Sequence, residues 1–388
     1  MGICVGKPTN VAHASSTQIL EDMLSNKGKS KDSKNQSKTI IFNKVSKAHK
    51  DDDAPKLINI KAFNLNDLKT ATKNFRPDSL LGEGGFGQVF KGWIDETTLA
   101  PAKPGTGLVV AVKVLKADSR QGQREFLTEL EFMGRLCHKN LVKLIGYCAE
   151  WENRVLVYEY MPKGCLDNHL FRKSVQPVPW ATRMSIAIDV AQGLSFLHSK
   201  EPSIIYRDLK ASNILLDTDF NAKLSDFGLA RTGPVGDNTH VSTRVVGTNG
   251  YAAPEYIATG HLTPKNDVYS FGVVLLELLS GRRAIAEERD GGVEETLVEW
   301  VKPFLSDSKR VLRIMDIRLG GQYSKKGAQA VAALASKCLQ TDHRYRPTMA
   351  IVLASLEEIQ NVQKEVPRIY PDLEHQRVGS LNGASHKR

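Results

Sequence analysis

The chain has 388 residues, of which 41% are hydrophobic and 25% are charged, and these proportions are typical of a soluble globular protein. Its five cysteines are odd in number and form no CxxC pair, which argues against a disulfide framework and against a zinc site. No stretch of the sequence approaches the roughly 18 consecutive apolar residues of a membrane-spanning helix. The N-terminus also lacks the apolar core of a secretion signal. We therefore expect an intracellular protein.

The net charge of +10 is concentrated near the N-terminus. Residues 1–50 contain nine lysines against three acidic residues, and the stretch NKGKSKDSKNQSK at 26–38 is rich in Ser and Asn as well. Such a sequence cannot bury enough apolar surface to offset the entropy of ordering it, so we predict that residues 1–60 are disordered. A basic tail suits an anionic membrane surface, whereas the lack of interleaved aromatic residues argues against nucleic acid.

Beyond the tail, the predicted elements begin with a short helix within 63–75, which we expect Asn66 to cap. A β-branched run at 109–115 predicts a buried strand. Residues 124–137 carry apolar side chains at helical spacing. The members of this stripe are Phe126, Leu130, Met133 and Cys137.

Two further helices are predicted in the strongly apolar stretches 182–198 and 267–281. A strand-rich first third followed by a helix-rich remainder indicates an α+β fold in two lobes. We expect a folded domain at 61–360, with an N-lobe of about 61–160 and a C-lobe of about 161–360. Residues 361–388 are expected to form a flexible C-terminal tail.

The stretch GEGGFGQV at 82–89 has the GxGxxGxV spacing of a loop that covers phosphates. Glycines allow the backbone to approach phosphate oxygens because no Cβ stands in the way. The same spacing opens dinucleotide-binding folds, but there a helix follows directly, and here the β-rich VFKGW at 89–93 predicts a strand. No GxxxxGK[ST] motif occurs, which excludes the Walker-type nucleotide hydrolases.

Lys113 lies within the apolar run VAVK, where an unpaired ammonium group would be costly. On the following helix, Glu129 lies roughly 70° from the centre of the apolar stripe, while Glu125 and Glu131 lie roughly 110° and 130° away. Glu129 is therefore the acid best placed to pair with Lys113, although spacing alone does not exclude a solvated carboxylate.

The stretches YRDLKASN at 206–213 and SDFG at 225–228 carry the remaining polar groups. Asp208 is placed to accept the proton of a substrate hydroxyl, and Lys210 to steady a transferring phosphoryl group. Asn213 and Asp226 offer the oxygen ligands that Mg²⁺ prefers. The intervening residues read as a hairpin, which would bring Asn213 and Asp226 to one end of the structure.

Together these motifs make residues 63–359 resemble a eukaryotic protein kinase, with APE at 253–255, DVYSFG at 267–272 and RYRPTM at 344–349 in register. The resemblance implies a bilobal protein kinase fold in which Asp267 holds the backbone around Asp208 and Arg346 pairs with Glu255. Lys210 matches the serine/threonine form. Stretches such as FNLNDLKTATKNF, LVKLIGYC and YAAPEYIATGHLT are similar to plant receptor-like cytoplasmic kinases of subfamily VII.

The resemblance further implies ATP and Mg²⁺ as cofactors, with Mn²⁺ as a substitute, and protein substrates. It assigns catalysis to Asp208, Lys210, Lys113 and Glu129, and metal binding to Asn213 and Asp226. The residues that it assigns to ATP are Leu81, Gly82, Glu83, Gly84, Gly85, Phe86, Gly87, Gln88, Val89, Lys113 and Met161.

Three residues depart from the usual kinase pattern. Tyr206 replaces the His of HRD, but that His packs and bonds the backbone, so Tyr206 leaves the chemistry unimpaired. Cys165 stands where relatives have Ser, and we expect an inert thiol. Asn249 stands where Tyr is usual, next to the active centre.

Regulation and localisation are predicted from two further segments. Arg207 beside Asp208 predicts control by an activation-loop phosphate, for which the resemblance names Ser242 and Thr243 as acceptors, with Thr248 contributing to the substrate floor. At the N-terminus, Gly2 and Cys4 are candidate myristoyl and palmitoyl acceptors, although the usual pattern has Ser or Thr where this chain has Gly6.

We therefore predict a serine/threonine protein kinase at the cytoplasmic face of the plasma membrane. Its expected partners are ATP, protein substrates, receptor kinases and the membrane surface, in plant signalling and in immunity in particular. The alternative is a pseudokinase that acts as a scaffold in a receptor complex.

Overall fold

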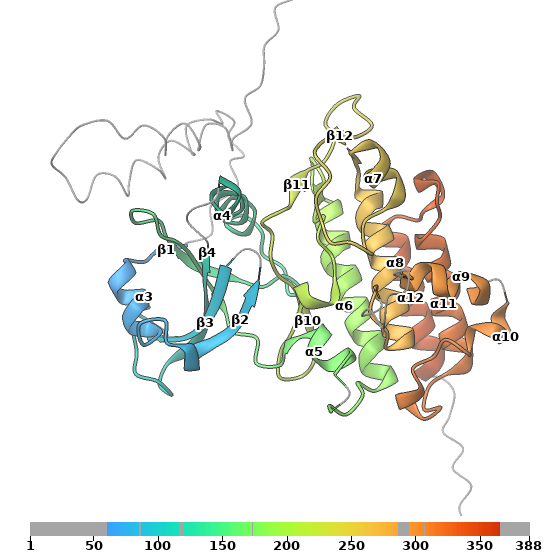
Figure 1. Cartoon of the computed structure of the whole chain (residues 1–388), viewed down its shortest axis with the longest axis horizontal. Coiled ribbons are helices and arrows are strands. Elements are labelled where there is room, and N and C mark those ends of the chain that lie inside the picture. The colour runs from blue at the N-terminus through green and yellow to red at the C-terminus, as the bar shows by residue number, and fades with distance from the viewer. Residues whose placement is uncertain are drawn as a thin grey trace, which may run out of the picture.

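The computed structural model describes residues 60–84, 87–115, 120–172, 174–285, 295–305 and 307–364. Two lobes lie side by side, a smaller one built on a curled sheet and a larger one built of helices (Figure 1). This arrangement confirms the two-lobed α+β fold predicted from the change of sequence pattern along the chain. No described helix is both long enough and apolar enough to cross a membrane.

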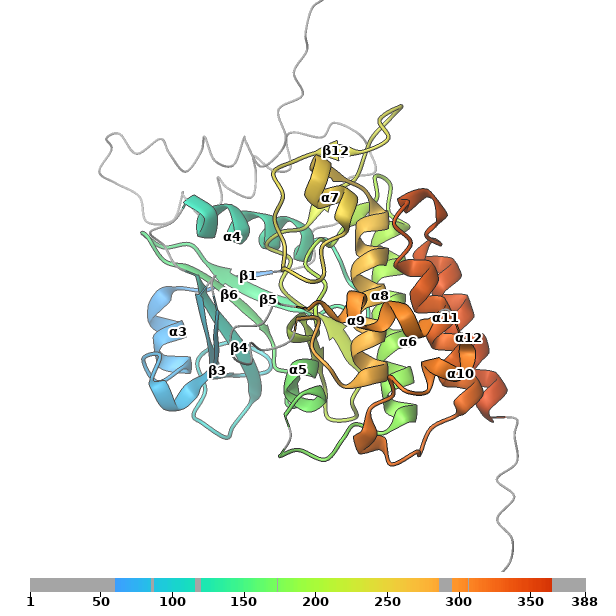
Figure 2. The same cartoon turned by 45° about the vertical axis from the view of Figure 1, so that its right-hand side comes forward.

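The N-lobe is a six-stranded sheet with the strand order β1-β5-β6-β4-β3-β2. Helix α4 lies against one face of this sheet, as Figure 2 shows, and α3 packs on β3 through the buried Leu68 and Ala71. The elements are β1 (Lys61–Ala62), α3 (Leu65–Ala71), η1 (Pro77–Ser79), β2 (Leu80–Gly84), β3 (Gly87–Ile94), β4 (Leu108–Leu115), α4 (Arg120–Met133), β5 (Leu144–Cys148) and β6 (Arg154–Glu159).

The C-lobe is mostly helical, with short strand pairs on the side that faces the N-lobe. Its first elements are β7 (Gly164–Cys165), α5 (Leu166–Leu170), α6 (Trp180–His198), β8 (Ile204–Ile205), η2 (Ala211–Asn213), β9 (Ile214–Leu216), β10 (Ala222–Leu224), β11 (Arg231–Thr232) and β12 (Val241–Ser242). Its later elements are α7 (Pro254–Thr259), β13 (His261–Leu262), α8 (Pro264–Ser280), α9 (Leu297–Leu305), α10 (Ser308–Val311), η3 (Ile317–Leu319), α11 (Lys325–Cys338), η4 (His343–Tyr345) and α12 (Met349–Lys364).

Helix α8 is the centre of the C-lobe, because every one of its residues from Asn266 to Ser280 except Tyr269 is buried. Thr263 begins the helix with a capping box, in which its hydroxyl accepts from the Lys265 amide while the Asn266 side chain accepts from the Thr263 amide. Asp267 is therefore fixed in the first turn of a rigid, buried helix, from which it can hold the loop that carries the candidate catalytic residues.

Two details of the predicted helices were wrong. Asn64, not Asn66, caps α3, since its side chain accepts from the Asp67 amide at 2.7 Å and Asn66 lies inside the helix. Helix α4 ends at Met133, so Cys137 lies beyond it and is exposed. A periodic apolar stripe does not reveal where a helix stops when the chain turns immediately afterwards.

Candidate active site

The Lys113 ammonium group joins the two lobes. It donates to both carboxylate oxygens of Glu129, at 3.0 and 3.1 Å, and to Oδ1 of Asp226 at 3.0 Å. Lys113 comes from the central strand β4 and Glu129 from α4, and their side chains are only 12% and 1% exposed. The sequence-derived pairing of Lys113 with Glu129 therefore matches the geometry, and Asp226 from the C-lobe completes the cluster.

Opposing effects determine the charge of this cluster. Burial disfavours the ammonium form of Lys113, but the negative charges of Asp226 and Glu129 outweigh it and raise the pKa of Lys113. Burial likewise acts to raise the pKa of Asp226, yet Lys113 dominates and lowers that pKa below its ordinary value. Lys113 is thus firmly cationic and Asp226 firmly anionic at neutral pH.

The segment after β10 directs Asp226 toward Lys113. Asp226 adopts a left-handed backbone conformation with φ of 58°, which is uncommon for a residue other than glycine. The next amide, of Phe227, donates to Glu129 Oε1 at 3.2 Å, and the Gly228 amide lies 3.4 Å from Asp226 Oδ1. Such strain persists only where surrounding contacts hold it, which is typical of functional sites.

Asp208 lies at the centre of a second polar cluster. Its other members are Lys210 and Asn213 of the same loop and Thr248 of the activation segment. The Lys210 ammonium lies 2.9 Å from Asp208 Oδ2, and the Asn213 amide donates to that oxygen at 2.9 Å. The Thr248 hydroxyl donates to Asp208 Oδ1 at 2.8 Å and accepts from Lys210 at 2.9 Å. Thr248 therefore locks Lys210 and Asp208 together, a contact that no local sequence pattern signals.

The two clusters are joined by backbone hydrogen bonds. The Ser225 amide and hydroxyl both donate to the Asn213 carbonyl, at 3.0 and 2.9 Å. Strands β9 and β10 pair antiparallel from Ile214 with Leu224 to Leu216 with Ala222. The hairpin predicted from the sequence is confirmed, and it brings Asn213 next to Asp226.

Tyr206 is a structural residue in this site. Its ring is fully buried and packs edge-to-face on Phe227 at 5.1 Å, and its hydroxyl donates to the Ser225 carbonyl. Asp267 accepts from the Tyr206 and Arg207 amides at 2.9 and 2.7 Å, as the resemblance implied. The Tyr206 ring and hydroxyl thus support the segment that carries Asp226.

Gly84 and Gly87 of the glycine-rich stretch pair with each other where β2 ends and β3 begins, at the edge of the sheet. In β3, Val89 pairs directly with Lys113 of β4, so the hairpin runs alongside that lysine. A Cβ on Gly87, whose φ is 149°, would lie 2.1 Å from the Val114 carbonyl oxygen, so this position requires glycine. Gly85 and Phe86 lie outside the described residues.

The other residues assigned to ATP follow the same hairpin or the link between the lobes. Met161 is buried immediately after β6, where the chain passes from one lobe to the other. Leu81 in β2 is exposed. The remaining members that the structure describes are Gly82, Glu83, Gly84 and Gln88, all within β2 and β3.

The oxygens of Asn213 and Asp226 suit a hard divalent cation. Among the described residues, the hydrogen bonds of the Asp226 carboxylate involve Oδ1 alone, and those of the Asn213 side chain involve its amide nitrogen and leave its oxygen. One carboxylate oxygen and one amide oxygen are the donor types that Mg²⁺ selects. The donor set therefore fits Mg²⁺, and these two residues would hold it.

Arg207 ties the catalytic loop to the activation segment. Its guanidinium group donates to the Thr243 hydroxyl at 2.9 Å, to the Arg244 carbonyl at 2.6 Å and to the Tyr256 hydroxyl at 2.7 Å. Ser242, by contrast, lies in β12 with an exposed side chain. Of the two predicted phosphate acceptors, Thr243 is the one in contact with the arginine.

A buried acid on α4 escaped the sequence analysis. The Glu125 side chain is as deeply buried as the core residues, and its carboxylate accepts from the Gln121 side-chain amide at 2.8 Å. Burial is the main cause that raises the pKa of Glu125 to about 7. Helical spacing places Glu125 roughly 110° from the centre of the apolar stripe that faces the sheet, so its burial was not predicted. The Gly228 segment covers the other side of α4, where a Cβ on Gly228 would meet Glu125 at 3.1 Å.

Neither of the other departures from the kinase pattern lies within the polar clusters. Cys165 precedes α5, and burial raises the pKa of its thiol, which disfavours the reactive thiolate. Asn249 is exposed and accepts from the Gly250 amide at 3.0 Å. Gly2 and Cys4 lie outside the described residues.

The chain has the architecture of ATP-dependent protein phosphotransferases. A curled sheet and a helical lobe hold lysine, aspartate and asparagine side chains between them. A profile of the family described as protein tyrosine and serine/threonine kinase matches residues 75–356. The chain therefore belongs to the protein kinase family.

Similar proteins from plants show which kind of protein kinase this chain resembles. The chain is 63% identical over 305 residues to the probable serine/threonine-protein kinase PBL3 of Arabidopsis thaliana, covering 79% of this chain and 71% of that protein. It is 55% identical over 370 residues to PBL11 of the same plant, covering 95% and 93%. It is 60% identical over 313 residues to receptor-like cytoplasmic kinase 176 of rice, Oryza sativa subsp. japonica, covering 80% and 79%. The predicted likeness to plant receptor-like cytoplasmic kinases of serine/threonine type is confirmed.

Proposed function

We propose that the protein transfers the γ-phosphate of ATP to serine and threonine hydroxyls of protein substrates, with Asp208 as the proton acceptor. The observation that carries this proposal is the contact set of Asp208, in which Lys210 and Thr248 orient one carboxylate within a buried site. An aspartate held in this way can align an incoming hydroxyl and take its proton as the bond to phosphorus forms.

Lys113 would bind the triphosphate from the N-lobe side. Its pairing with Glu129 keeps the ammonium group extended and charged, and the neighbouring β2–β3 hairpin can close over the phosphates. Lys210 would then neutralise charge on the phosphoryl group as it approaches the hydroxyl. Held by Asn213 and Asp226, Mg²⁺ would supply charge neutralisation on the phosphate oxygens.

The transfer itself can be followed with γ-³²P-ATP and a generic protein substrate, with acid hydrolysis to identify the labelled amino acid. We expect label on phosphoserine and phosphothreonine. The alternative, a pseudokinase scaffold, is disfavoured because no catalytic position has been replaced. Absence of any Mg²⁺-dependent label with the purified full-length protein would favour that scaffold.

We further propose that phosphate on Thr243 activates the enzyme. The Thr243 hydroxyl already accepts from Arg207, the residue that precedes Asp208. Burial lowers the pKa of Arg231, and the positive charges of the nearby Arg207 and Arg124 lower it further. A doubly negative phosphate at Thr243 would relieve this repulsion and form charge-assisted hydrogen bonds.

Replacing both predicted acceptors, Ser242→Ala with Thr243→Ala, is expected to lower kcat by about tenfold or more, the equivalent of one lost charge-assisted bond. Thr243→Ala alone should account for most of the loss, because the Thr243 hydroxyl is the one that Arg207 contacts. The measurement is steady-state turnover of purified protein, with Thr239→Ala, an exposed hydroxyl of the same loop, as the control. Unchanged turnover of the double variant would refute the proposal.

We also propose that Gly2 and Cys4 carry lipids that hold the protein at the plasma membrane. One myristoyl chain gives only a binding constant of about 10⁴ M⁻¹, so a palmitoyl group on Cys4 and the lysine-rich stretch would complete the anchor. In this position the enzyme would act downstream of receptor kinases in plant signalling, immunity included. The rice relative is named a receptor-like cytoplasmic kinase, which supports a place on the cytoplasmic side.

Gly2→Ala is expected to move most of the protein from the membrane pellet to the supernatant after cell fractionation, because both the myristoyl acceptor and the entry to palmitoylation are lost. Gly6→Ala is the matched control, since it alters a nearby glycine and leaves the acceptor in place. If Gly2→Ala protein still sedimented with membranes like the control, the lipid anchor would be wrong.

A further inference from the structure

A hollow of about 380 Å³ opens at the end of the C-lobe, away from the candidate active site. It lies where the C-terminal end of α8 meets α9 and the segment between α10 and α11. The residues that line it are Phe171, Ser280, Gly281, Arg282, Trp300 and 313–318.

One wall of the hollow is rigid. The buried Asp316 carboxylate accepts hydrogen bonds from Arg183 of α6 at 2.6 Å and from Arg318 at 2.8 Å. Arg318 also donates to the Leu170 carbonyl. Arg183 in turn donates to the Leu278 carbonyl at 2.8 Å. These bonds fix the 313–318 segment to α6 and α8, so the hollow has a defined shape.

The rim combines unpaired positive charge with apolar surface. Arg282 stacks on Trp300 at 3.9 Å, and within the described ranges neither Arg282 nor Arg313 has an acidic partner. Ile317 is 92% exposed, an unusual state for a large aliphatic side chain. A segment that carried bulky apolar side chains next to carboxylates would cover Ile317 and pair with both arginines.

The chain leaves α12 at the same end of the C-lobe. Near its end, Gln360 of α12 lies 3.4 Å from the Ser185 hydroxyl of α6, two residues from Arg183, which binds Asp316. In both views α12 ends beside the segment between α10 and α11 (Figures 1 and 2). Since residues two apart lie on nearly opposite sides of a helix, the end of α12 is separated from the Arg183–Asp316 contact by the width of α6.

The sequence that follows supplies the matching chemistry. Residues 369–374 read IYPDLE, with apolar Ile369, Tyr370 and Leu373 beside the carboxylates of Asp372 and Glu374. The five residues from Lys364 to Ile369 can span roughly 17 Å when extended, which is enough to pass across α6. We propose that residues 369–374 of the same chain dock in this hollow, with their carboxylates on Arg282 and Arg313 and their apolar side chains over Ile317.

The test places the photo-crosslinking residue p-benzoyl-phenylalanine at position 370 of the full-length chain and maps the products by mass spectrometry. We expect crosslinks within one chain to 313–318 or to the Arg282 region. The same probe at position 381, outside the docking segment, should give no preference for the hollow. Crosslinks that form only between two copies, or that fall elsewhere on the surface, would overturn the proposal.

A charge exchange tests the pairing separately. Arg282→Glu with Arg313→Glu should lower the yield of the position-370 crosslink several-fold, and adding Asp372→Lys with Glu374→Lys should restore it. Recovery of the crosslink yield would also show that the protein with Glu at positions 282 and 313 has folded. An unchanged yield after reversal of the arginines, or no recovery in the exchanged chain, would contradict the assigned contacts.

Discussion

Asp208→Asn is expected to lower kcat by about 10³-fold, within the range associated with loss of a positioned general base. Asparagine keeps the size of the side chain and its contacts with Thr248, but it cannot accept the substrate proton. The KM for ATP should change little, because Lys113 and Asp226 remain in place. Such a split would identify Asp208 as a residue that acts during transfer and not in nucleotide binding.

The measurement is the initial rate of phosphate transfer as ATP and protein substrate are varied. Asp219→Asn is the matched control, since Asp219 is an exposed residue of the β9–β10 turn in the same part of the chain. It should retain wild-type kcat. If the Asp208→Asn variant kept more than about a tenth of wild-type kcat, Asp208 would not be the general base.

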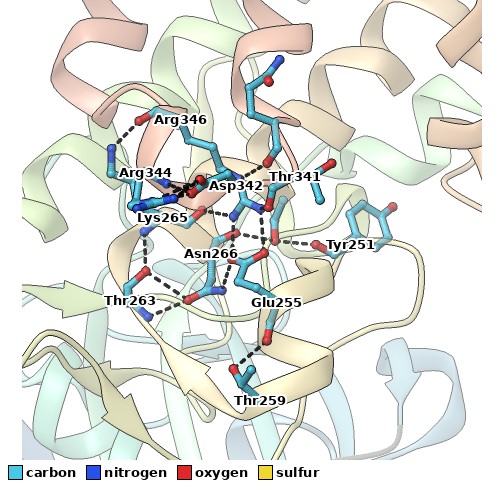
Figure 3. A network of polar contacts seen from close by, with 12 residues as sticks. Tyr251, Glu255, Thr259, Thr263, Lys265, Asn266, Thr341, Asp342, Arg344 and Arg346 are labelled. Atoms are coloured by element: carbon cyan, nitrogen blue, oxygen red, sulfur yellow. Dashed lines mark hydrogen bonds and ion pairs between the residues drawn. The ribbon is translucent and has the colours of Figure 1, made fainter.

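Arg346→Ala is expected to lower the free energy of unfolding by about 3–5 kcal/mol, the cost of leaving one member of a buried ion pair alone. The Arg346 side chain is 0% exposed and binds both oxygens of Glu255 at 2.7 Å (Figure 3). It also donates to the Gln340 carbonyl at 2.8 Å. Its loss would leave the Glu255 carboxylate with the neutral Asn266 amide at 3.1 Å in place of its charged partner, and would remove this donor from the Gln340 carbonyl.

Arg344 offers an internal control two residues away. Its pair with Asp342 has the same 2.7 Å distance, but the Arg344 side chain is 76% exposed (Figure 3). Arg344→Ala should therefore cost less than about 1 kcal/mol. Urea unfolding of both variants compares them directly, and equal losses would mean that burial does not set the strength of the Arg346 pair.

The sequence predicted what depends on short stretches of chain. Lys113 and Glu129 each belong to one regular element, so periodicity ranked Glu129 as the acid best placed to reach Lys113. The β9–β10 hairpin was visible as two apolar arms around a polar turn, and it carries Asn213 to Asp226. The structural role expected for Tyr206 agrees with its burial and its hydrogen bond to the Ser225 carbonyl.

The contacts that the sequence did not predict depend on how distant segments fold over one another. Thr248 reaches Asp208 across 40 residues only because the activation segment turns back over the catalytic loop. Glu125 is buried by the Gly228 segment, which a helical stripe cannot anticipate. Asn64 and Asn66 are chemically equal caps, and the choice between them rests on where α3 begins.

The central claim is that Lys113, Asp208, Asn213 and Asp226 form one site for a bound triphosphate. Its most direct test compares ³²P transfer from ATP by the wild type, by Lys113→Met, and by Lys103→Met, which alters an exposed lysine in the β3–β4 loop. We predict strong Mg²⁺-dependent labelling by the wild type and by Lys103→Met, and background labelling by Lys113→Met. Equal labelling by the wild type and Lys113→Met would contradict the account.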